Sequence, residues 1–548
     1  MRARHTVVAA GTGFVLGTLA IGPGLAPGFV LSYDMVFVPR QTFGRATFGL
    51  TGMLPRHVPS DAFMTALAHV LPADVAQKAI LLAIFTLACA SASVLVPSPR
   101  LLPRLAAGIV YTWNPFVAER LLLGHWALLL GYAALPLVVV AAARGHHRRL
   151  ALALLPAAIG GFAAWAVSGL VALVVAGYGR RVRPVLLTAA ILLVVALPWL
   201  VPSLLRATDT PADAAGVAAF AARADTPFGT LGSLLLLGGA WNAETVPGGY
   251  GGALTSAAWL LVVAAGLLAY ARTRPIRGLG TAAGAGFAVA ALGAVAPGVL
   301  RAAIGLWPVF AVVRDGQQFV APLAVVVAVG IGLAADRLPY RAGPAPLLPV
   351  LLLPLLLLPG LAWGAGGRLR AVHYPADWTR ARAIVAAGPG DVLVLPWEAY
   401  RGYPWNHGRR VLEPLPRFLP TRVIVNDGVH VAVPGGRGIA LAAEDPRARA
   451  LDPLVRSGAP LTDALAARGV RYVAVDAGAP ETRLAGADRL VSGPDLTLYR
   501  IPAEVPAHEP HPEELPVYIA WFITFATFIW SVQVPASNLG KRSRTKES

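Results

Sequence analysis

The stretch "PVLLTAAILLVVALPWLVPSLL", residues 184–205, decides the fold class of this chain. It contains no charged residue, and its length matches the roughly 20 residues that a helix needs to cross the bilayer core. Apolar runs of similar length recur along the 548 residues, of which 56% are hydrophobic and 14% are charged. Soluble proteins have roughly 25% charged residues. The sequence therefore predicts a polytopic α-helical membrane protein that is embedded in the lipid bilayer.

The charges between the apolar runs predict how the chain is threaded. A net charge of +18 could indicate nucleic-acid binding. The basic residues, however, gather in short hydrophilic gaps and near the termini, which is the positive-inside pattern of cytoplasmic loops. The clusters are Arg2/Arg4, Arg100/Arg104, Arg144/Arg148/Arg149, Arg180/Arg181/Arg183, Arg272/Arg274/Arg277, Arg337/Arg341 and Lys541/Arg542/Arg544/Lys546. We therefore expect no nucleic-acid partner.

Placing every basic cluster in the cytoplasm predicts about twelve crossings with both termini inside. The expected spans are 6–27, 76–97, 103–117, 126–143, 184–205, 253–271, 279–300, 319–335, 345–364 and 516–534. The remaining two crossings fall in 150–179, which is flanked by basic clusters but is too short for two full spans. We expect a pair of short, tilted or re-entrant helices there, broken near Gly160-Gly161 or Ser168-Gly169.

The segment 366–515 is polar, rich in Pro and Gly, and domain-sized. Short apolar strands are expected at 391–396, 421–427, 470–476 and 496–501, with helices at 377–388 and 461–469. We predict a membrane domain over 1–365, a small extracytoplasmic α/β domain over 366–515, a last span within 516–535 and a basic cytoplasmic tail over 536–548.

Polar residues gather in the predicted outer loops, in "SYDMVFVPRQ" (32–41), "YTWNPFVAERLLLGHW" (111–126) and "WPVFAVVRDGQQFVAP" (307–322). The candidate site residues are Asp34, Arg40, Glu119, Arg120, His125, Arg314 and Asp315. Each of them could instead be solvated, form a local ion pair or cap a helix. Ion-coupled transporters keep their ionisable groups at mid-membrane, where this chain has almost none. The pattern therefore favours chemistry or binding at the outer surface.

These residue types fit an amphiphilic lipid-phosphate substrate whose tail lies in the bilayer. Arginine and histidine would bind the phosphate, and a carboxylate would take a proton from an acceptor hydroxyl. Asp34 suits the base, Arg314 suits the phosphate, and Glu119 suits a metal or the acceptor hydroxyl. Further acids could hold a divalent cation, Mg²⁺ or Mn²⁺, against the leaving group, and this cofactor is left open.

The stretch "LPWEAYRGYPWNHGRR" (395–410) is dense in aromatic residues for a polar segment. Aromatic side chains beside Arg and Asn commonly bind sugars, so Trp397, Tyr400 and Trp405 are candidate sugar-binding residues. The alternative is that they dock the polar domain onto the membrane helices.

The chain resembles the GT-C glycosyltransferases. The resemblance is carried by Asp34 in the first outer loop, the twelve-helix plan, the short tipped helices and the polar domain before the last helix. It implies a polyprenyl-phosphate sugar donor and a cell-envelope glycan or glycolipid acceptor, as in the actinobacterial branch that builds arabinan and mannan. No second acid follows Asp34 until Asp61, whereas GT-C members often have a paired acidic motif in this loop. "WNPFVAERLLLGHW" (113–126) also resembles large actinobacterial and archaeal membrane proteins related to this superfamily.

The functional prediction is a glycosyltransferase of the bacterial plasma membrane that acts outside the cytoplasm, with Asp34 as the general base. Two alternatives stay open, a non-catalytic envelope-assembly protein and a lipid or polysaccharide flippase.

Overall fold

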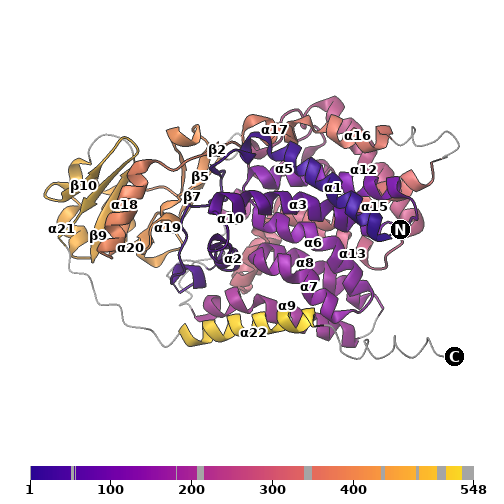
Figure 1. Cartoon of the computed structure of the whole chain (residues 1–548), viewed down its shortest axis with the longest axis horizontal. Helices are drawn as coiled ribbons and strands as arrows, with labels where there is room; N and C mark the ends of the chain where they lie inside the picture. Colours follow the sequence, from indigo (N-terminus) through magenta and orange to yellow (C-terminus); the bar gives the residue numbers. More distant parts are fainter. Residues whose placement is uncertain are drawn as a thin grey trace.

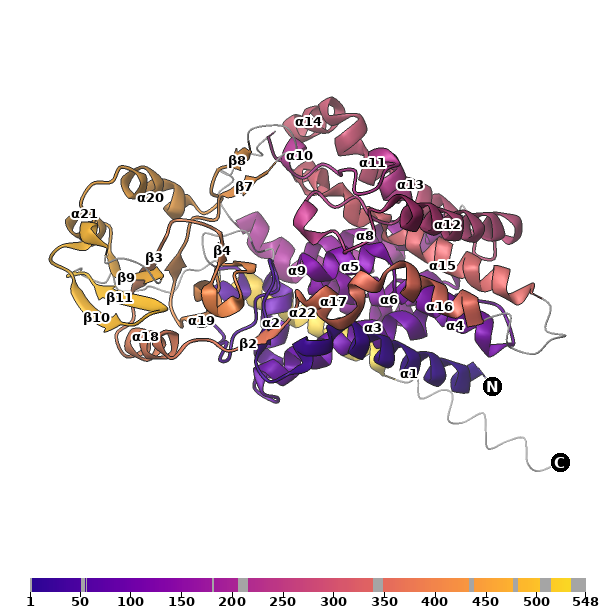
Figure 2. The same ribbon diagram turned by 90° about the horizontal axis from the view of Figure 1, so that it is seen from above.

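The structure, a computed structural model, has a helical bundle at one end and a smaller unit containing a β-sheet at the other (Figure 1). The residues that it describes are 2–50, 55, 57–179, 182–205, 215–338, 348–432, 438–476, 481–502 and 514–533. The predicted basic tail, 536–548, lies outside them. The N-terminal end of α1 lies far from the sheet in both ribbon views (Figures 1 and 2).

Long apolar helices form the bundle where the sequence predicts spans. They are α1 (Arg2–Ile21), α3 (Ala73–Leu95), α6 (Trp126–Ala143), α9 (Val182–Leu205), α12 (Ala253–Thr273), α15 (Ala321–Asp336, with the 3-10 turn Gly316–Val320 before it) and α22 (Glu514–Val532). Among the described residues, seven helices are long and apolar enough to cross a membrane, or up to nine if each bent pair is one span. These helices identify a membrane protein, and the twelve-span topology stays a prediction.

Three predicted spans are shorter or bent, and each break coincides with a proline. The span at 103–117 is α4 (Leu101–Thr112), followed by the separate helix α5 (Pro115–Leu122). The span at 279–300 is α13 (Leu279–Val295), bent by 99° against α14 (Pro297–Leu306). The span at 345–364 is α16 (Leu348–Leu357), bent by 65° against 359–367. Pro115, Pro297 and Pro359 lack the amide hydrogen that would continue the preceding helix, but they suit the first turn of a new one.

The region 150–179 is a pair of helices, α7 (His147–Ile159) and α8 (Gly161–Gly177), so the predicted break at Gly160–Gly161 is present. Gly161 has a φ of +73°, which glycine adopts without strain. A Cβ atom on Gly160 would come within 2.4 Å of the Ala127 carbonyl oxygen. The two glycines therefore turn the chain and let it pack closely on α6.

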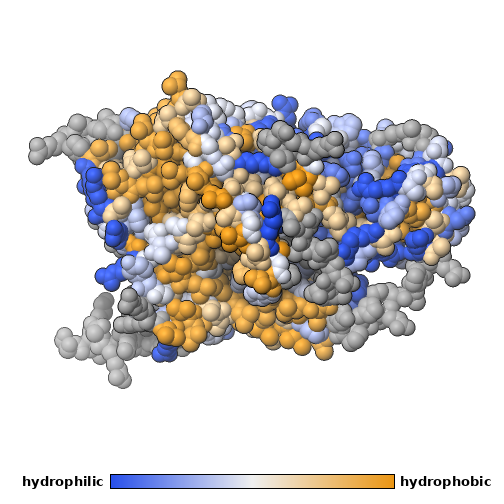
Figure 3. All heavy atoms as spheres, turned by 180° about the vertical axis from the view of Figure 1, so that it is seen from behind, coloured by the Kyte–Doolittle hydropathy of each residue, from blue (hydrophilic) through white to orange (hydrophobic). Residues whose placement is uncertain are grey.

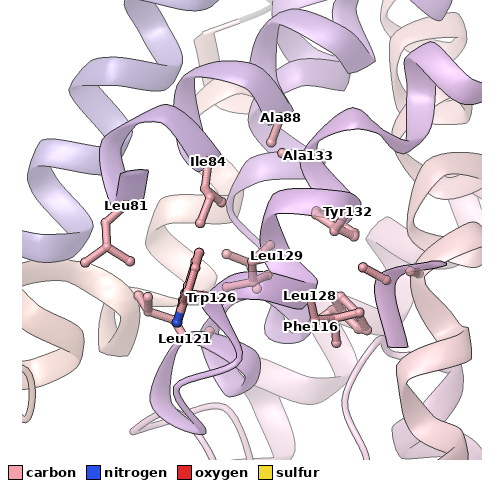
Figure 4. Packing of buried hydrophobic residues seen from close by; sticks show 14 of the residues in the cluster. Leu81, Ile84, Ala88, Phe116, Leu121, Trp126, Leu128, Leu129, Tyr132 and Ala133 are labelled. Atoms are coloured by element: carbon pink, nitrogen blue, oxygen red, sulfur yellow. The ribbon is translucent and has the colours of Figure 1, made fainter. Parts of the chain in front are cut away.

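Buried aromatic and aliphatic side chains fill the centre of the bundle (Figure 4). Tyr111 and Tyr132 stack with ring centroids 4.2 Å apart. The helices α12 and α15 cross at Gly266 and Gly330, where any side chain would overlap the opposite backbone. On the surface, a hydrophobic band separates a hydrophilic edge from the hydrophilic sheet end (Figure 3). This distribution suits a bundle immersed in lipid.

The sheet unit contains a five-stranded mixed sheet in the order β10-β11-β9-β3-β6. Its strands are β3 (Asp391–Leu395), β6 (Val423–Ile424), β9 (Val470–Asp476), β10 (Asp488–Ser492) and β11 (Leu496–Arg500). Strand β3 runs parallel to β6 and β9, whereas β11 is antiparallel to both β9 and β10. The central residues of β3 and β9 are buried, as their continuous apolar sequences predict. The expected strand at 421–427 is reduced to the two residues of β6.

The remaining helices and strands are short or belong to the junction between the two parts. They are α2 (Val58–Ala68), α10 (Ala215–Ala219), α11 (Gly229–Leu235), α17 (Ala362–Gly367), α18 (Ala376–Ala387), α19 (Leu415–Phe418), α20 (Pro446–Arg456), α21 (Thr462–Ala466), β1 (Phe29–Val30), β2 (Ala371–Val372), β4 (Tyr400–Gly402), β5 (Arg410–Leu412), β7 (Val429–Val431) and β8 (Ile439–Leu441).

The loop after α1 joins the sheet unit to the bundle by backbone pairing. Strand β1 pairs with β2, and β4 forms a hairpin with β5. Tyr33 N donates to the Arg410 carbonyl oxygen at 2.8 Å, and Leu412 N donates to the Tyr33 carbonyl oxygen at 2.9 Å. An ion pair of 3.1 Å between Asp61 and Arg417 adds a second connection. The neighbour of Tyr33, Asp34, is thereby fixed at the junction.

Candidate active site

The backbone of Asp34 is held against the corner between α5 and α6. Asp34 N donates to the Leu123 carbonyl oxygen at 3.1 Å. Gly124, with a φ of +78°, lies against the same loop, and a Cβ atom there would be 2.2 Å from both Met35 N and Ser32 O. Only glycine therefore permits the close approach that sets the position of Asp34.

The carboxylate of Asp34 contacts two polar side chains from different parts of the chain. The Tyr400 hydroxyl donates to Oδ1 at 2.5 Å, and His125 Nε2 lies 3.2 Å from Oδ2. Burial raises the pKa of Asp34, but the hydrogen bond and charge of His125, the charge of His57 and the Tyr400 hydrogen bond together lower it to about 2. Asp34 is therefore an anion at neutral pH, and its side chain is 28% exposed.

An arginine lies directly beside this loop. Arg409 Nε donates to Ser32 Oγ at 2.7 Å, and Nη2 donates to the Leu122 carbonyl oxygen at 3.1 Å. Burial and the positive charge of Arg368 lower the pKa of Arg409 to about 10. Two guanidinium groups placed close together, one of them partly desolvated, are favourable for binding an anion.

Arg368 is held from the opposite side by the segment before α12. Its Nη1 donates to the carbonyl oxygens of Glu244 at 3.0 Å and Val246 at 3.2 Å. The Glu244 carboxylate accepts a hydrogen bond from the Tyr33 hydroxyl. Burial and this bond raise the pKa of Tyr33 to about 12, so Tyr33 stays a neutral donor. The cluster places two arginines and two tyrosines around the backbone that carries Asp34.

Glu119 and Arg120 lie on α5, and both are 1% exposed. Burial raises the pKa of Glu119 well above its ordinary value, and the charge and hydrogen bond of Asp225 add to this effect, which Arg120 offsets only in part. A Cβ atom on Gly238 would lie 2.5 Å from Asp225 Oδ2 and 3.0 Å from Glu119 Oε1. Burial and the nearby Asp225 therefore favour the protonated form of Glu119.

Three predicted phosphate-binding residues lie apart from the Asp34 contacts. Arg314 pairs with Glu444 at 3.4 Å and lies over the Phe220 ring. Asp315 has a buried Oδ1 without a hydrogen-bond partner among the described residues. Arg40 is exposed, and its charge acts on Arg382. The structure thus brings Asp34 and His125 together and does not join these three residues to them.

The aromatic candidates have different surroundings. Trp397 is 8% exposed in the core of the sheet unit, and its Nε1 donates to Asp452 at 2.9 Å. Trp405 packs in an aromatic cluster with Tyr403 and Tyr374, at ring-centroid distances of 4.9 and 5.2 Å. Burial and aromatic packing favour the structural alternative for both tryptophans. Tyr400 contacts Asp34 instead, a role that the sequence did not indicate.

The residues present do not assemble a metal site of the usual kind. Asp34 and His125 are two possible ligands, but no group of three or more His, Cys, Asp or Glu side chains that could hold an ion occurs in the described ranges. Metal sites made by protein need more ligands than this pair supplies. Asp34 and His125 alone therefore do not form a preformed cation site in the described part of the chain.

The overall fold has been seen before among solved structures. No family model and no curated protein matches the chain. Among solved structures, it matches the cryo-electron microscopy structure of the arabinofuranosyltransferase AftD from Mycobacteria, with a TM-score of 0.54 and 19% identity over 93% of this chain and 40% of that chain. A mutant form of AftD matches with the same TM-score and 18% identity, over 92% of this chain and 42% of that one.

The chain therefore shares its overall fold with part of AftD, and it spans about 40% of the solved chains that it matches. The resemblance drawn from the sequence is confirmed at the level of the fold.

Proposed function

We propose that the protein is a membrane glycosyltransferase that moves a sugar from a polyprenyl-phosphate donor to a cell-envelope glycan or glycolipid acceptor, with Asp34 as the general base. One observation carries the proposal. An ionised carboxylate is held by His125 and Tyr400 at the junction between the lipid-immersed bundle and the polar sheet unit. A lipid-linked donor and a polar acceptor meet at such a boundary.

The reaction follows from the positions of the charged groups. The acceptor hydroxyl forms a bond to the anomeric carbon while the bond from that carbon to the phosphate oxygen breaks, and its electrons leave with the phosphate. Arg368 and Arg409 would stabilise this leaving anion. The proton of the attacking hydroxyl goes to Asp34. A carboxylate with a pKa of about 2 is a weak base, so it accepts the proton late, when the new bond has made the hydroxyl strongly acidic.

The predicted placement in the plasma membrane, with the sheet unit outside the cytoplasm, supports the same scheme. Polyprenyl-phosphate sugars are lipids, and the hydrophobic band of Figure 3 lies next to the sheet unit. The likeness to an arabinofuranosyltransferase makes a pentofuranosyl donor the first to test.

One observation favours a second reading, the non-catalytic envelope-assembly protein. Arg314 is paired with Glu444 rather than directed to Asp34, and Glu119 is buried against Asp225. A scaffold would use such side chains for internal contacts in this way. The flippase alternative is not favoured by a specific contact.

The test uses purified full-length protein in lipid nanodiscs with a panel of radiolabelled polyprenyl-phosphate sugars and envelope glycan extract. Wild type should release label from one donor, and Asp34→Asn should not. Asp488→Asn is the matched control, because Asp488 is exposed on the sheet unit and pairs only with Arg500 at 2.7 Å in the described structure. Equal release by wild type and Asp34→Asn would show that Asp34 is not the base. Release by none of the three folded proteins would favour the assembly protein.

A further inference from the structure

A cavity of about 700 Å³ opens at the end of the bundle away from Asp34. It lies where α3, α6 and α8 end, where α4 and α9 begin, and beside the segment 275–277 that joins α12 to α13. Its lining includes residues of the basic clusters that separate the apolar runs of the sequence. The positive-inside rule places these clusters at the cytoplasmic face of the membrane.

Three arginines, Arg104, Arg144 and Arg277, line the cavity, and none of its described lining residues is acidic. Arg104 is 4% exposed, and its Nε donates to the Ser98 carbonyl oxygen at 2.7 Å, which fixes the guanidinium in the wall. The nearby acid Asp336 is already engaged, because it accepts from Ser98 Oγ at 2.6 Å and pairs with Arg100 at 3.3 Å. The exposed Arg144 and Arg277 therefore bring positive charge to the cavity.

The rest of the lining indicates what kind of anion fits. The walls are aliphatic, with Val94, Val140, Val175 and Ile276 among them, and Tyr178 is the only other described lining residue with a polar side chain. A nucleotide or a free sugar phosphate would need side-chain hydrogen-bonding partners for its base or hydroxyls, and apart from the arginines only Tyr178 could supply one among the described lining residues. A phosphate that carries acyl chains matches both the arginines and the aliphatic surface.

We propose that this cavity binds the headgroup phosphate of an anionic phospholipid, such as phosphatidylglycerol, from the cytoplasmic leaflet. Basic pockets between transmembrane helices on this side of a membrane suit such headgroups. The site is separate from the sugar-transfer chemistry proposed at Asp34. It would fix the relative positions of six chain segments through one lipid.

Native mass spectrometry of the full-length protein tests the proposal, with phosphatidylglycerol or phosphatidylcholine of the same acyl chains added to the detergent. The double variant Arg144→Gln/Arg277→Gln removes two lining charges from exposed positions, and Arg272→Gln/Arg337→Gln removes two exposed arginines that do not line the cavity. Wild type and the control pair should retain phosphatidylglycerol. The lining pair should bind it about tenfold more weakly, since each arginine near the surface contributes to anionic-lipid binding.

Equal retention by the lining and control pairs would overturn the proposal, as would equal binding of phosphatidylcholine and phosphatidylglycerol by wild type. Millimolar inorganic phosphate forms a third arm of the experiment. If it displaces the lipid and binds equally well alone, the site takes a soluble anion and the lipid assignment is wrong. If the double variant does not fold, Arg277→Gln alone should still weaken binding, by about threefold.

Discussion

Asp34 and Glu119 are two carboxyl groups on neighbouring segments, and their environments drive them to opposite protonation states. Asp34 meets His125 and Tyr400, and its pKa falls to about 2. Glu119 is buried against Asp225, and its pKa rises well above the ordinary value. Two acids with separated pKa values suit two different roles. The proposed mechanism uses Asp34 as the proton acceptor and gives Glu119 no part in the proton transfer.

The largest effect is expected for Asp34→Asn. The amide keeps the shape of the side chain but cannot take the proton, so kcat for sugar transfer should fall by about 10³-fold. The thermal unfolding midpoint and the solubility in nanodiscs should stay close to wild type. A transfer rate within tenfold of wild type would show that Asp34 is not the general base.

Gly124→Ala tests the backbone that positions Asp34. The new methyl group would overlap Met35 N and Ser32 O at a φ of +78°, so the loop must move. We expect the transfer rate to fall by about 10²-fold, because small misplacements of a catalytic group are costly. Gly145→Ala is the control, since Gly145 has a φ of +65° but no atom within 4 Å of the added Cβ. Similar losses in both variants would mean that backbone strain alone is responsible.

Stability against pH should separate the two acids by sign. The folded pKa of Asp34 is lowered, so its contribution is present above pH 4 and is lost as the pH falls toward 2, by about 2 kcal/mol. The folded pKa of Glu119 is raised, so its contribution is present at low pH and is lost as the pH rises above its unfolded pKa. Chemical denaturation of wild type, Asp34→Asn and Glu119→Gln from pH 2 upward measures how the free energy of unfolding changes with pH through each acid. Slopes of the same sign would contradict the assignment.

Tyr400→Phe tests how far the Tyr400 hydroxyl lowers the pKa of Asp34. Loss of the hydroxyl removes one of the interactions that lower the pKa of Asp34, so the acidic limb of the pH–rate profile should move to higher pH. We expect the transfer rate at neutral pH to fall by about tenfold, because the carboxylate is less well oriented. Tyr518→Phe, on the exposed face of α22, should leave the profile unchanged. A lower rate without a shift of the acidic limb would show that Tyr400 acts through packing and not through the pKa of Asp34.

The smallest effect is expected for Glu119→Gln. Glutamine fills the same buried space without a charge, so the transfer rate should stay within about threefold of wild type. Glu119→Ala would leave the buried polar groups around Asp225 without this neighbour and should lower the free energy of unfolding by about 1 to 3 kcal/mol. A loss of activity in Glu119→Gln as large as that in Asp34→Asn would show that transfer requires the ionised form of Glu119.

The sequence predicted the parts of this molecule that depend on local patterns. The apolar run 126–143 coincides with α6, and the short distance between two basic clusters predicted a helix pair whose break lies at Gly160–Gly161, one of the two expected positions. Asp34 could be singled out because it is the only acid in its region, and His125 because it lies at the end of a span. The bends at Pro297 and Pro359 were missed because hydropathy alone does not distinguish a straight helix from a broken one.

The partners of Asp34 could not be predicted, because they depend on contacts between distant segments. Arg368 and Arg409 are separated from the first loop by more than three hundred residues and have no characteristic spacing. Tyr400 was a candidate for sugar binding, yet its hydroxyl is committed to Asp34. Trp397 was a candidate for the same reason, and only the three-dimensional structure shows that it is buried.

The pairing of Tyr33 with the hairpin strand β5 has a consequence for biosynthesis. The first loop is among the earliest parts of the chain to leave the ribosome, whereas its partners Arg410 and Leu412 emerge after most of the bundle has been made. Asp34 must wait through that interval without Tyr400, which lies 366 residues later. The site is therefore completed only when the sheet unit has been synthesised and docked, so an unfinished chain carries no assembled site.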